Sequence, residues 1–176
     1  MRYLKVFVKD QSANAQADTV TLLFFQRSPQ LPDELVRKAT AVDISADGLV
    51  DYQITGDIDG NGVSDMQDRA LLKHFANSAL KLGWLSRPSM PNRSINFYVS
   101  RFDTAHHPVD IRLDFYQNEK PGLDRERLNL SLTVSDPDGK GVMQLDDDTL
   151  PHDQFDTVDR QALQRMINGY LKLGWQ

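Results

Sequence analysis

The sequence predicts an α+β fold in which a four-stranded antiparallel meander followed by a C-terminal helix occurs twice, as a tandem duplication. Three observations predict this class. The pentapeptide LKLGW occurs at residues 80–84 and again at residues 171–175, an offset of 91. Each half opens with stretches in which apolar and polar residues alternate, as they do in half-buried strands. Each half closes with apolar residues at helical spacing, which indicates an amphipathic helix.

The repeat extends through the chain. At the offset of 91, Met1 aligns with Asn92, and the alignment continues without a gap to Leu85 opposite Gln176, with 20 identities in 85 pairs. Such self-similarity indicates that the two copies share one fold. The first repeat is therefore expected at residues 1–85 and the second at residues 93–176. Residues 86–92, which contain two prolines, are expected to form a linker.

The strands are expected in the same order in both repeats. The first two lie at residues 4–8 and 20–24 in the first repeat and at residues 95–99 and 111–115 in the second. A hairpin supplies the third and fourth strands, with its turn at residues 44–50 and 134–142, where Asp-Gly permits positive φ. A short helical turn at residues 32–39 is expected in the first repeat only.

The closing helix of each repeat carries an apolar stripe that would cover one face of the sheet. The stripe residues are Leu72, Phe75, Ala76, Ala79 and Leu80 in the first repeat and Leu163, Met166, Ile167, Tyr170 and Leu171 in the second. On the opposite face of the first repeat, Phe7, Leu23 and Phe25 come together. We interpret them as a contact with the other repeat, a protein partner or another copy of the chain, the alternative being ordinary exposure of scattered aromatic residues.

Composition excludes several classes of function. The 176 residues carry a net charge of −5 without a basic block, so no nucleic-acid partner is expected. The chain has no cysteine, which excludes disulfides and thiolate chemistry. No apolar run approaches the length of a membrane span, so no membrane partner is expected. The opening segment MRYLKVFVKD lacks the apolar centre of a secretion signal, which favours a cytoplasmic or virion-assembled protein, or export without a signal.

An acidic window at residues 57–68, DIDGNGVSDMQD, has the spacing of a calcium loop. Calcium takes six to eight oxygen ligands, and a short loop supplies them from alternate residues around a sharp turn at glycine, here Gly62. The expected ligands are Asp57, Asp59, Asn61, the backbone carbonyl of Val63, Asp65 and Asp68. The last of these would close the coordination shell from the first turn of the following helix.

This window resembles the EF-hand loop, most closely the loop-then-helix version found in dockerins and in thrombospondin type 3 repeats, which also close with aspartate at position 12. The resemblance covers only the loop and the start of the helix, and it implies a bound Ca²⁺ ion. Two departures matter. Ser64 stands where paired EF-hands use an aliphatic residue, and the chain has one such loop where dockerins have two. The resemblance therefore supports a metal loop but not dockerin-type partner binding.

The second repeat serves as an internal control. Its aligned window, residues 148–159, reads DTLPHDQFDTVD, in which Leu150, His152 and Asp153 replace two ligands and the turn glycine. Too few oxygens remain for calcium there. Asp156 and Asp159 persist, which indicates that they, like Asp65 and Asp68, cap a helix. For the first loop, capping alone in a solvated acidic turn remains the alternative to calcium.

Other polar clusters are weaker candidates. The window DISADGLVD at residues 43–51 lacks a ligand at position 12, and LDDDT at residues 145–149 is interpreted as a solvated strand end. His106 and His107 are interpreted as part of a surface loop. No phosphate-binding glycine loop, nucleophile elbow or metalloprotease helix is present, so no catalytic residues are expected.

The leading hypothesis is therefore a non-enzymatic, calcium-binding structural or protein-interaction protein. Calcium would rigidify the strand-to-helix corner of the first repeat. The alternative is a small-ligand enzyme or binding domain with a pocket between sheet and helix. A third interpretation, a calcium-responsive switch, is disfavoured because cooperative sensors pair their loops, whereas this chain has a single loop.

Overall fold

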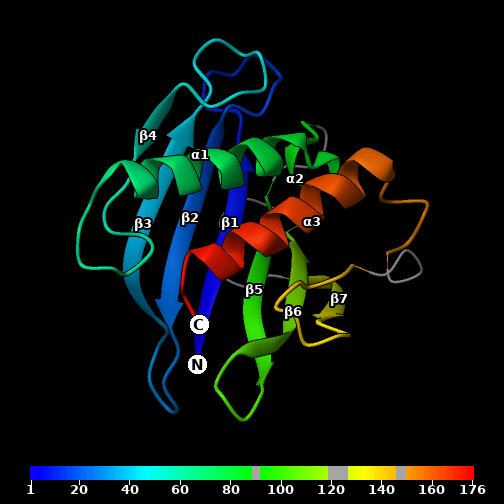
Figure 1. Ribbon diagram of the computed structural model, residues 1–176. Helices are drawn as coiled ribbons and strands as arrows, with labels where there is room; N and C mark the ends of the chain where they lie inside the picture. The colour runs from blue at the N-terminus through cyan, green and yellow to red at the C-terminus, as the bar shows by residue number, and fades with distance from the viewer. Residues whose placement is uncertain (89–91, 119–126, 146–149) are drawn as a thin grey trace.

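The computed structural model describes residues 1–88, 92–118, 127–145 and 150–176. Within these residues, seven strands form one antiparallel sheet, accompanied by three helices (Figure 1). The strands are β1 (Arg2–Lys9), β2 (Thr19–Gln26), β3 (Glu34–Val42), β4 (Tyr52–Ile54), β5 (Arg93–Phe102), β6 (Pro108–Gln117) and β7 (Arg127–Ser135). The helices are α1 (Met66–Lys81), α2 (Gly83–Ser86) and α3 (Thr157–Lys172). The predicted combination of antiparallel strands with a C-terminal helix is confirmed.

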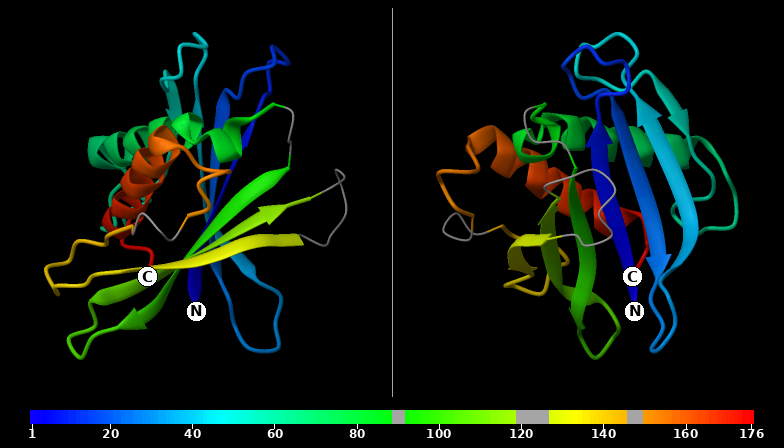
Figure 2. Two further views of the ribbon diagram at one scale, coloured as in Figure 1. Left: turned by 90° about the vertical axis from the view of Figure 1, so that its right-hand side faces the viewer. Right: turned by 180° about the vertical axis from the view of Figure 1, so that it is seen from behind.

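The two halves of the chain meet in the middle of the sheet. The strand order is β4-β3-β2-β1-β5-β6-β7, so the first strand of each half pairs with the other. In this pairing Lys5 lies opposite Asn96, its own counterpart at the offset of 91, and Leu4 lies opposite Phe97. The register is therefore nearly two-fold symmetric about the Lys5–Asn96 pair. The sheet is strongly twisted, and its two halves run in clearly different directions (Figure 2).

The expected helical turn at residues 32–39 is wrong, because β3 occupies most of this segment. Its pairing with β2 extends from Glu34 opposite Gln26 to Val42 opposite Thr19, and these ladder hydrogen bonds override the weak local helical preference. In the second half, Ser135 and Gln144 form an isolated bridge where the fourth strand was expected. The described residues thus show three strands in the second half.

The registers of the third strands also differ between the halves. Leu22 lies opposite Ala39, whereas its counterpart Leu113 lies opposite Leu132, two residues further along the aligned sequence. The gapless sequence alignment therefore does not match the structural pairing in this strand. The predicted hairpin turns at residues 44–50 and 134–142 are present.

Helices α1 and α3 cover one face of the sheet, and the hydrophobic cluster beneath them contains residues from both halves (Figures 1 and 2). The ring of Phe97 on β5 lies 5.8 Å from Phe75 of α1 and 5.5 Å from Tyr170 of α3. The two helices approach closely at Gly169, where a Cβ atom would lie 2.9 Å from a ring carbon of Phe75. Glycine at this position allows both helices to pack on the same sheet.

The two LKLGW segments anchor each helix to the opposite half. Trp84, which follows α1, packs edge-on against Phe115 of β6 at 4.9 Å. Trp175, which follows α3, packs edge-on against Phe24 of β2 at 5.7 Å. Phe24 and Phe115 are counterparts at the offset of 91, so the contacts are reciprocal. Residues 89–91 of the expected linker lie outside the described residues, and Gly83–Ser86 form α2.

Candidate metal site

The acidic window forms the loop that connects β4 to α1. Two of its glycines adopt positive φ, +77° at Gly60 and +91° at Gly62, which other residues adopt only at a cost. The Asp57 carboxylate accepts hydrogen bonds from the backbone N–H groups of Gly60, at 2.7 Å, and Gly62, at 3.0 Å. The loop therefore curls around the side chain of its own first aspartate.

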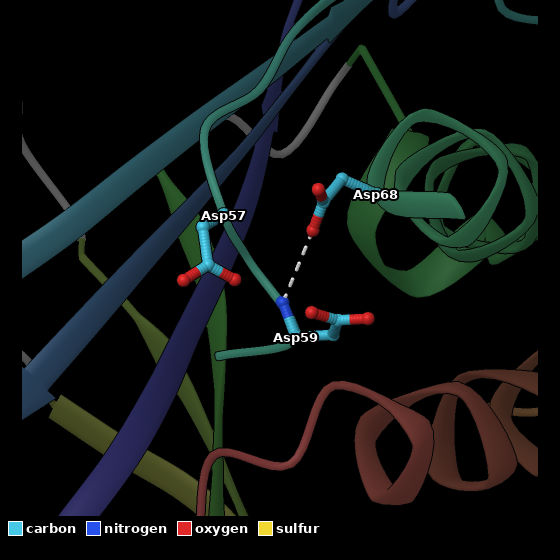
Figure 3. Close-up of side chains that lie close together, drawn as sticks. All are labelled: Asp57, Asp59 and Asp68. Atoms are coloured by element: carbon cyan, nitrogen blue, oxygen red, sulfur yellow. Dashed lines mark hydrogen bonds between the residues drawn. The ribbon is translucent and has the colours of Figure 1, made fainter. Parts of the chain in front are cut away.

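This folding brings three carboxylates together. One oxygen each from Asp57, Asp59 and Asp68 lies within 4.8 Å of the others, and Figure 3 shows the two loop aspartates beside the aspartate from the first turn of α1. Calcium–oxygen distances are about 2.3–2.6 Å, so two oxygens on opposite sides of one ion are about 5 Å apart. One cation could therefore contact an oxygen of all three carboxylates.

Hydrogen bonds offset the mutual repulsion of these carboxylates. Asp68 is fully buried and accepts from the backbone N–H groups of Ile58 at 2.8 Å, Asp59 at 3.3 Å and Asp65 at 2.8 Å. It thus ties the loop to the helix whether or not an ion is bound. The sequence predicted Asp68 as a ligand and a cap; the capping role is confirmed, and the ligand role stays a prediction.

The ionisation of Asp57 is also favourable for binding a cation. Desolvation raises the pKa of this carboxyl, but the hydrogen bonds from Gly62 and Gly60 and the nearby charge of Arg37 outweigh it, and the pKa lies below its usual range. Asp57 is therefore a charged carboxylate at neutral pH. A hard cation such as Ca²⁺ requires its ligands in this form.

The other expected ligands have different neighbours. Asp65 lies outside the three-carboxylate group and is the N-cap of α1, accepting from the backbone N–H of Gln67 at 2.7 Å. The Asn61 amide oxygen accepts from the Val63 N–H at 2.8 Å. The amide of Asn61 also donates to Asp59 at 3.1 Å, so it lies beside the carboxylate group.

The corresponding corner of the second half has a different interior. Asp156 and Asp159 form the same reciprocal capping box at the start of α3 that Asp65 and Asp68 form at α1, which confirms the predicted capping role. Asp148 lies outside the described residues. Phe155, the counterpart of Ser64, is buried against Phe115 at 5.5 Å, and Leu150 is buried as well. This corner is filled by apolar side chains.

Two other acidic loops close on themselves, whereas residues 146–149 of the window LDDDT lie outside the described residues. Asp43 accepts from the backbone N–H of Gly48 at 2.7 Å, and Asp51 accepts from that of Ser45 at 2.8 Å, within the hairpin turn between β3 and β4. In the loop with the adjacent histidines, Asp103 accepts from the backbone N–H of His107 at 2.8 Å. These aspartates serve as turn acceptors, in agreement with the weaker weight that the sequence gave to residues 43–51 and with the surface loop predicted at the histidines.

On the sheet face opposite the helices, Phe7, Leu23 and Phe25 are only partly exposed. Phe25 stacks on Tyr3 at 5.0 Å, and Tyr3 in turn stacks on Tyr98 of β5 at 5.2 Å. Sequence reasoning missed Tyr3, although it occupies the same face of β1 as Phe7 by simple alternation. Phe7 and Leu23 line a groove of 540 Å³ that also contains cationic side chains and lies at the α2 end of the sheet.

Compared with protein-family models, curated proteins and solved structures, the chain shows no significant match. Among the described residues, no helix is both long enough and apolar enough to cross a membrane. A functional assignment therefore depends on the chain's own residues and their geometry.

Proposed function

We propose that this protein is a non-enzymatic, calcium-binding structural or protein-interaction protein in which Ca²⁺ rigidifies the corner between β4 and α1. One observation carries the proposal: oxygens of Asp57, Asp59 and Asp68 lie within 4.8 Å of one another across the loop and the helix. An ion bound to all three would join the loop to α1 in addition to the hydrogen bonds that Asp68 accepts and the burial of Ile58.

The surroundings of the loop favour a lock over a switch. The C-terminal segment packs against the loop, since a Cβ atom at Gly174 would lie 3.0 Å from the backbone oxygen of Asp59. Next in the chain, Trp175 packs on Phe24 in the core and lies under the Arg37 side chain at 5.2 Å. An ion that holds Asp59 in place would thereby also stabilise the packing of the C-terminal residues Gly174 and Trp175.

The proposal includes a tandem duplication of a meander followed by a helix. It is supported by the near-symmetric pairing of β1 with β5 and by the reciprocal packing of Trp84 and Trp175. It is further supported by the equivalent capping boxes of α1 and α3. In this proposal an ion stabilises the corner before α1 in the first copy, and the buried Phe155 stabilises the corresponding corner in the second.

A partner contact on the outer sheet face belongs to the same proposal. Phe7 and Leu23 border the groove on that face, beside the stacked ring of Phe25. Another protein or a second copy of the chain would bury these side chains. Sedimentation of the wild type and of a Phe7→Ser/Leu23→Ser variant tests this: a contact between copies predicts a smaller particle for the variant, and equal masses would contradict it.

Calorimetric titration with calcium tests the central claim. We expect one ion per chain, and no binding by Asp59→Ala, because that change removes a central ligand while leaving the buried cap Asp68 in place. Asp153→Ala is the matched control, since it removes an exposed carboxylate from the corresponding loop of the second half. Zero stoichiometry for the wild type, or unchanged binding by Asp59→Ala, would overturn the proposal.

A further inference from the structure

A second charged feature lies on the outside of the helix layer. A groove of 500 Å³ runs between α1 and α3, and all of its ionisable lining residues are basic. These residues are His74, Lys81, Arg165 and Lys172. The amides of Asn77 and Asn168 line the same groove and add neutral hydrogen-bond donors. The groove therefore offers donors and positive charge without a carboxylate to compete for them.

The positive charge is not balanced by neighbouring residues of the helices. The acidic residues of α1 and α3 are Asp68 and Asp159, and both are buried in their capping boxes. Among the described residues, the ion pairs do not include Lys81, Arg165 or Lys172. The chain as a whole has a net charge of −5, so this groove is opposite in sign to the net charge of the molecule.

The basic side chains are spread along the groove. His74 and Lys81 are seven residues apart on α1, as are Arg165 and Lys172 on α3. This separation is nearly two helical turns, or about 10 Å along each axis. The arrangement suits an anion with several charges in a row better than a single small ion. Lys81 and Lys172 are also counterparts at the offset of 91, so each half contributes the same kind of group.

We propose that the groove between α1 and α3 binds a short polyphosphate, such as the triphosphate group of a nucleotide or free tripolyphosphate. Lysine ammonium groups and the Arg165 guanidinium are typical phosphate donors. A long nucleic acid fits less well, because it would extend from the groove over a protein surface of net negative charge. Among the described residues that line the groove, Phe75 is the only Phe, Tyr or Trp, and it is buried, so no large ring is exposed there on which bases could stack.

Titration of the full chain with tripolyphosphate in calcium-free buffer tests this inference. We expect saturable binding at about 50 mM salt that weakens strongly at about 300 mM, as screening of exposed charges requires. A Lys81→Gln/Lys172→Gln variant is expected to bind about tenfold more weakly. Lys38→Gln/Lys73→Gln is the control, because it removes the same charge from exposed lysines outside the groove. The affinity of this control variant for tripolyphosphate is expected to stay within about twofold of the wild-type affinity.

The two phosphate sources and the competing partners are distinguished in the same assay. Tighter binding of a nucleoside triphosphate than of tripolyphosphate identifies the nucleotide as the source, and equal binding identifies the phosphate chain alone. Three results would overturn the inference: no binding of either, an equal loss in both lysine variants, or much tighter binding of an oligonucleotide or of anionic phosphatidylserine vesicles. Thermal melting of each variant confirms that it is folded. The outcome is independent of calcium binding at Asp57, Asp59 and Asp68.

Discussion

The two strand-to-helix corners of this protein begin the same way and are stabilised differently. Asp65 and Asp68 cap α1 as Asp156 and Asp159 cap α3. In front of α3 the corner is filled by Leu150 and Phe155, both 1% exposed. In front of α1 the loop instead carries Asp57 and Asp59 beside Asp68, and only Ile58 is buried among its apolar residues.

The difference shows two physical ways to hold the same turn. Burial of a phenylalanine removes apolar surface from water and acts under all ionic conditions. A loop of carboxylates is held by backbone hydrogen bonds and by charge, so its stability depends on cations and on pH. We therefore expect the stability of the first corner to respond to cations and pH, whereas the burial of Phe155 does not depend on them.

The largest effect is expected at the second corner. Phe155→Ala should lower the free energy of unfolding by about 3–5 kcal/mol, because it leaves a cavity between Trp84 and Phe115. Its counterpart Ser64 is exposed, so Ser64→Ala should change stability by less than about 0.5 kcal/mol. Urea denaturation measures both. A loss below about 1 kcal/mol for Phe155→Ala would contradict apolar stabilisation of this corner.

Calcium is expected to act on the first corner. At about 100–1,000 times its dissociation constant, Ca²⁺ should raise the free energy of unfolding by about 2–4 kcal/mol in the wild type and leave Asp59→Ala unchanged. Hydrogen exchange should slow at Gly60 and Gly62 with calcium, and stay the same at Phe155. Scattering should show no change of particle size. A large change in size without a change in melting temperature would favour a switch.

The two glycines of LKLGW provide a smaller, matched comparison. Gly174 has φ of +60° and lies against the backbone of the first loop, whereas Gly83 lies outside the positive-φ range and beside the Asp159 side chain. Gly174→Ala should therefore cost about 1–2 kcal/mol and weaken calcium binding. Gly83→Ala should lower the free energy of unfolding by less, because the backbone at Gly83 does not adopt positive φ. Equal losses of unfolding free energy for the two variants in urea titrations would contradict this, because they would show that the first loop can move away from a side chain at residue 174.

The smallest expected effect is the change in stability at low pH that results from protonation of Asp57. The pKa of Asp57 is depressed in the folded protein, so its contribution is present above the unfolded value of about 3.9 and is lost as pH falls through the folded value. Without calcium, wild type and Asp57→Asn should thus differ in stability at pH 7 and converge as the pH falls through the folded pKa of Asp57. Melting curves across this range measure the difference, and a constant gap at every pH would contradict it.

Sequence reasoning succeeded where the signal is local. The apolar stripes of both helices predicted the residues that α1 and α3 bury, including Leu72, Phe75, Leu163 and Met166. Asp57, Asp59 and Asp68 fall within a twelve-residue window, so their approach could be predicted from spacing alone. It failed at residues 32–39, where pairing along β2 decides the conformation and no local pattern reports it.

By itself the sequence determined the elements with regular periodicity, the internal repeat and the acidic loop, because each is set by residues close together in the chain or by direct identity. Tertiary structure alone decided that the two halves join through β1 and β5 into one sheet, and that each tryptophan packs on the other half. It also gathered Lys81 and Lys172, which lie far apart in the sequence, into one cationic groove. These features depend on which elements pack against each apolar face. Periodicity predicts that such a face exists, but it does not predict which element covers it.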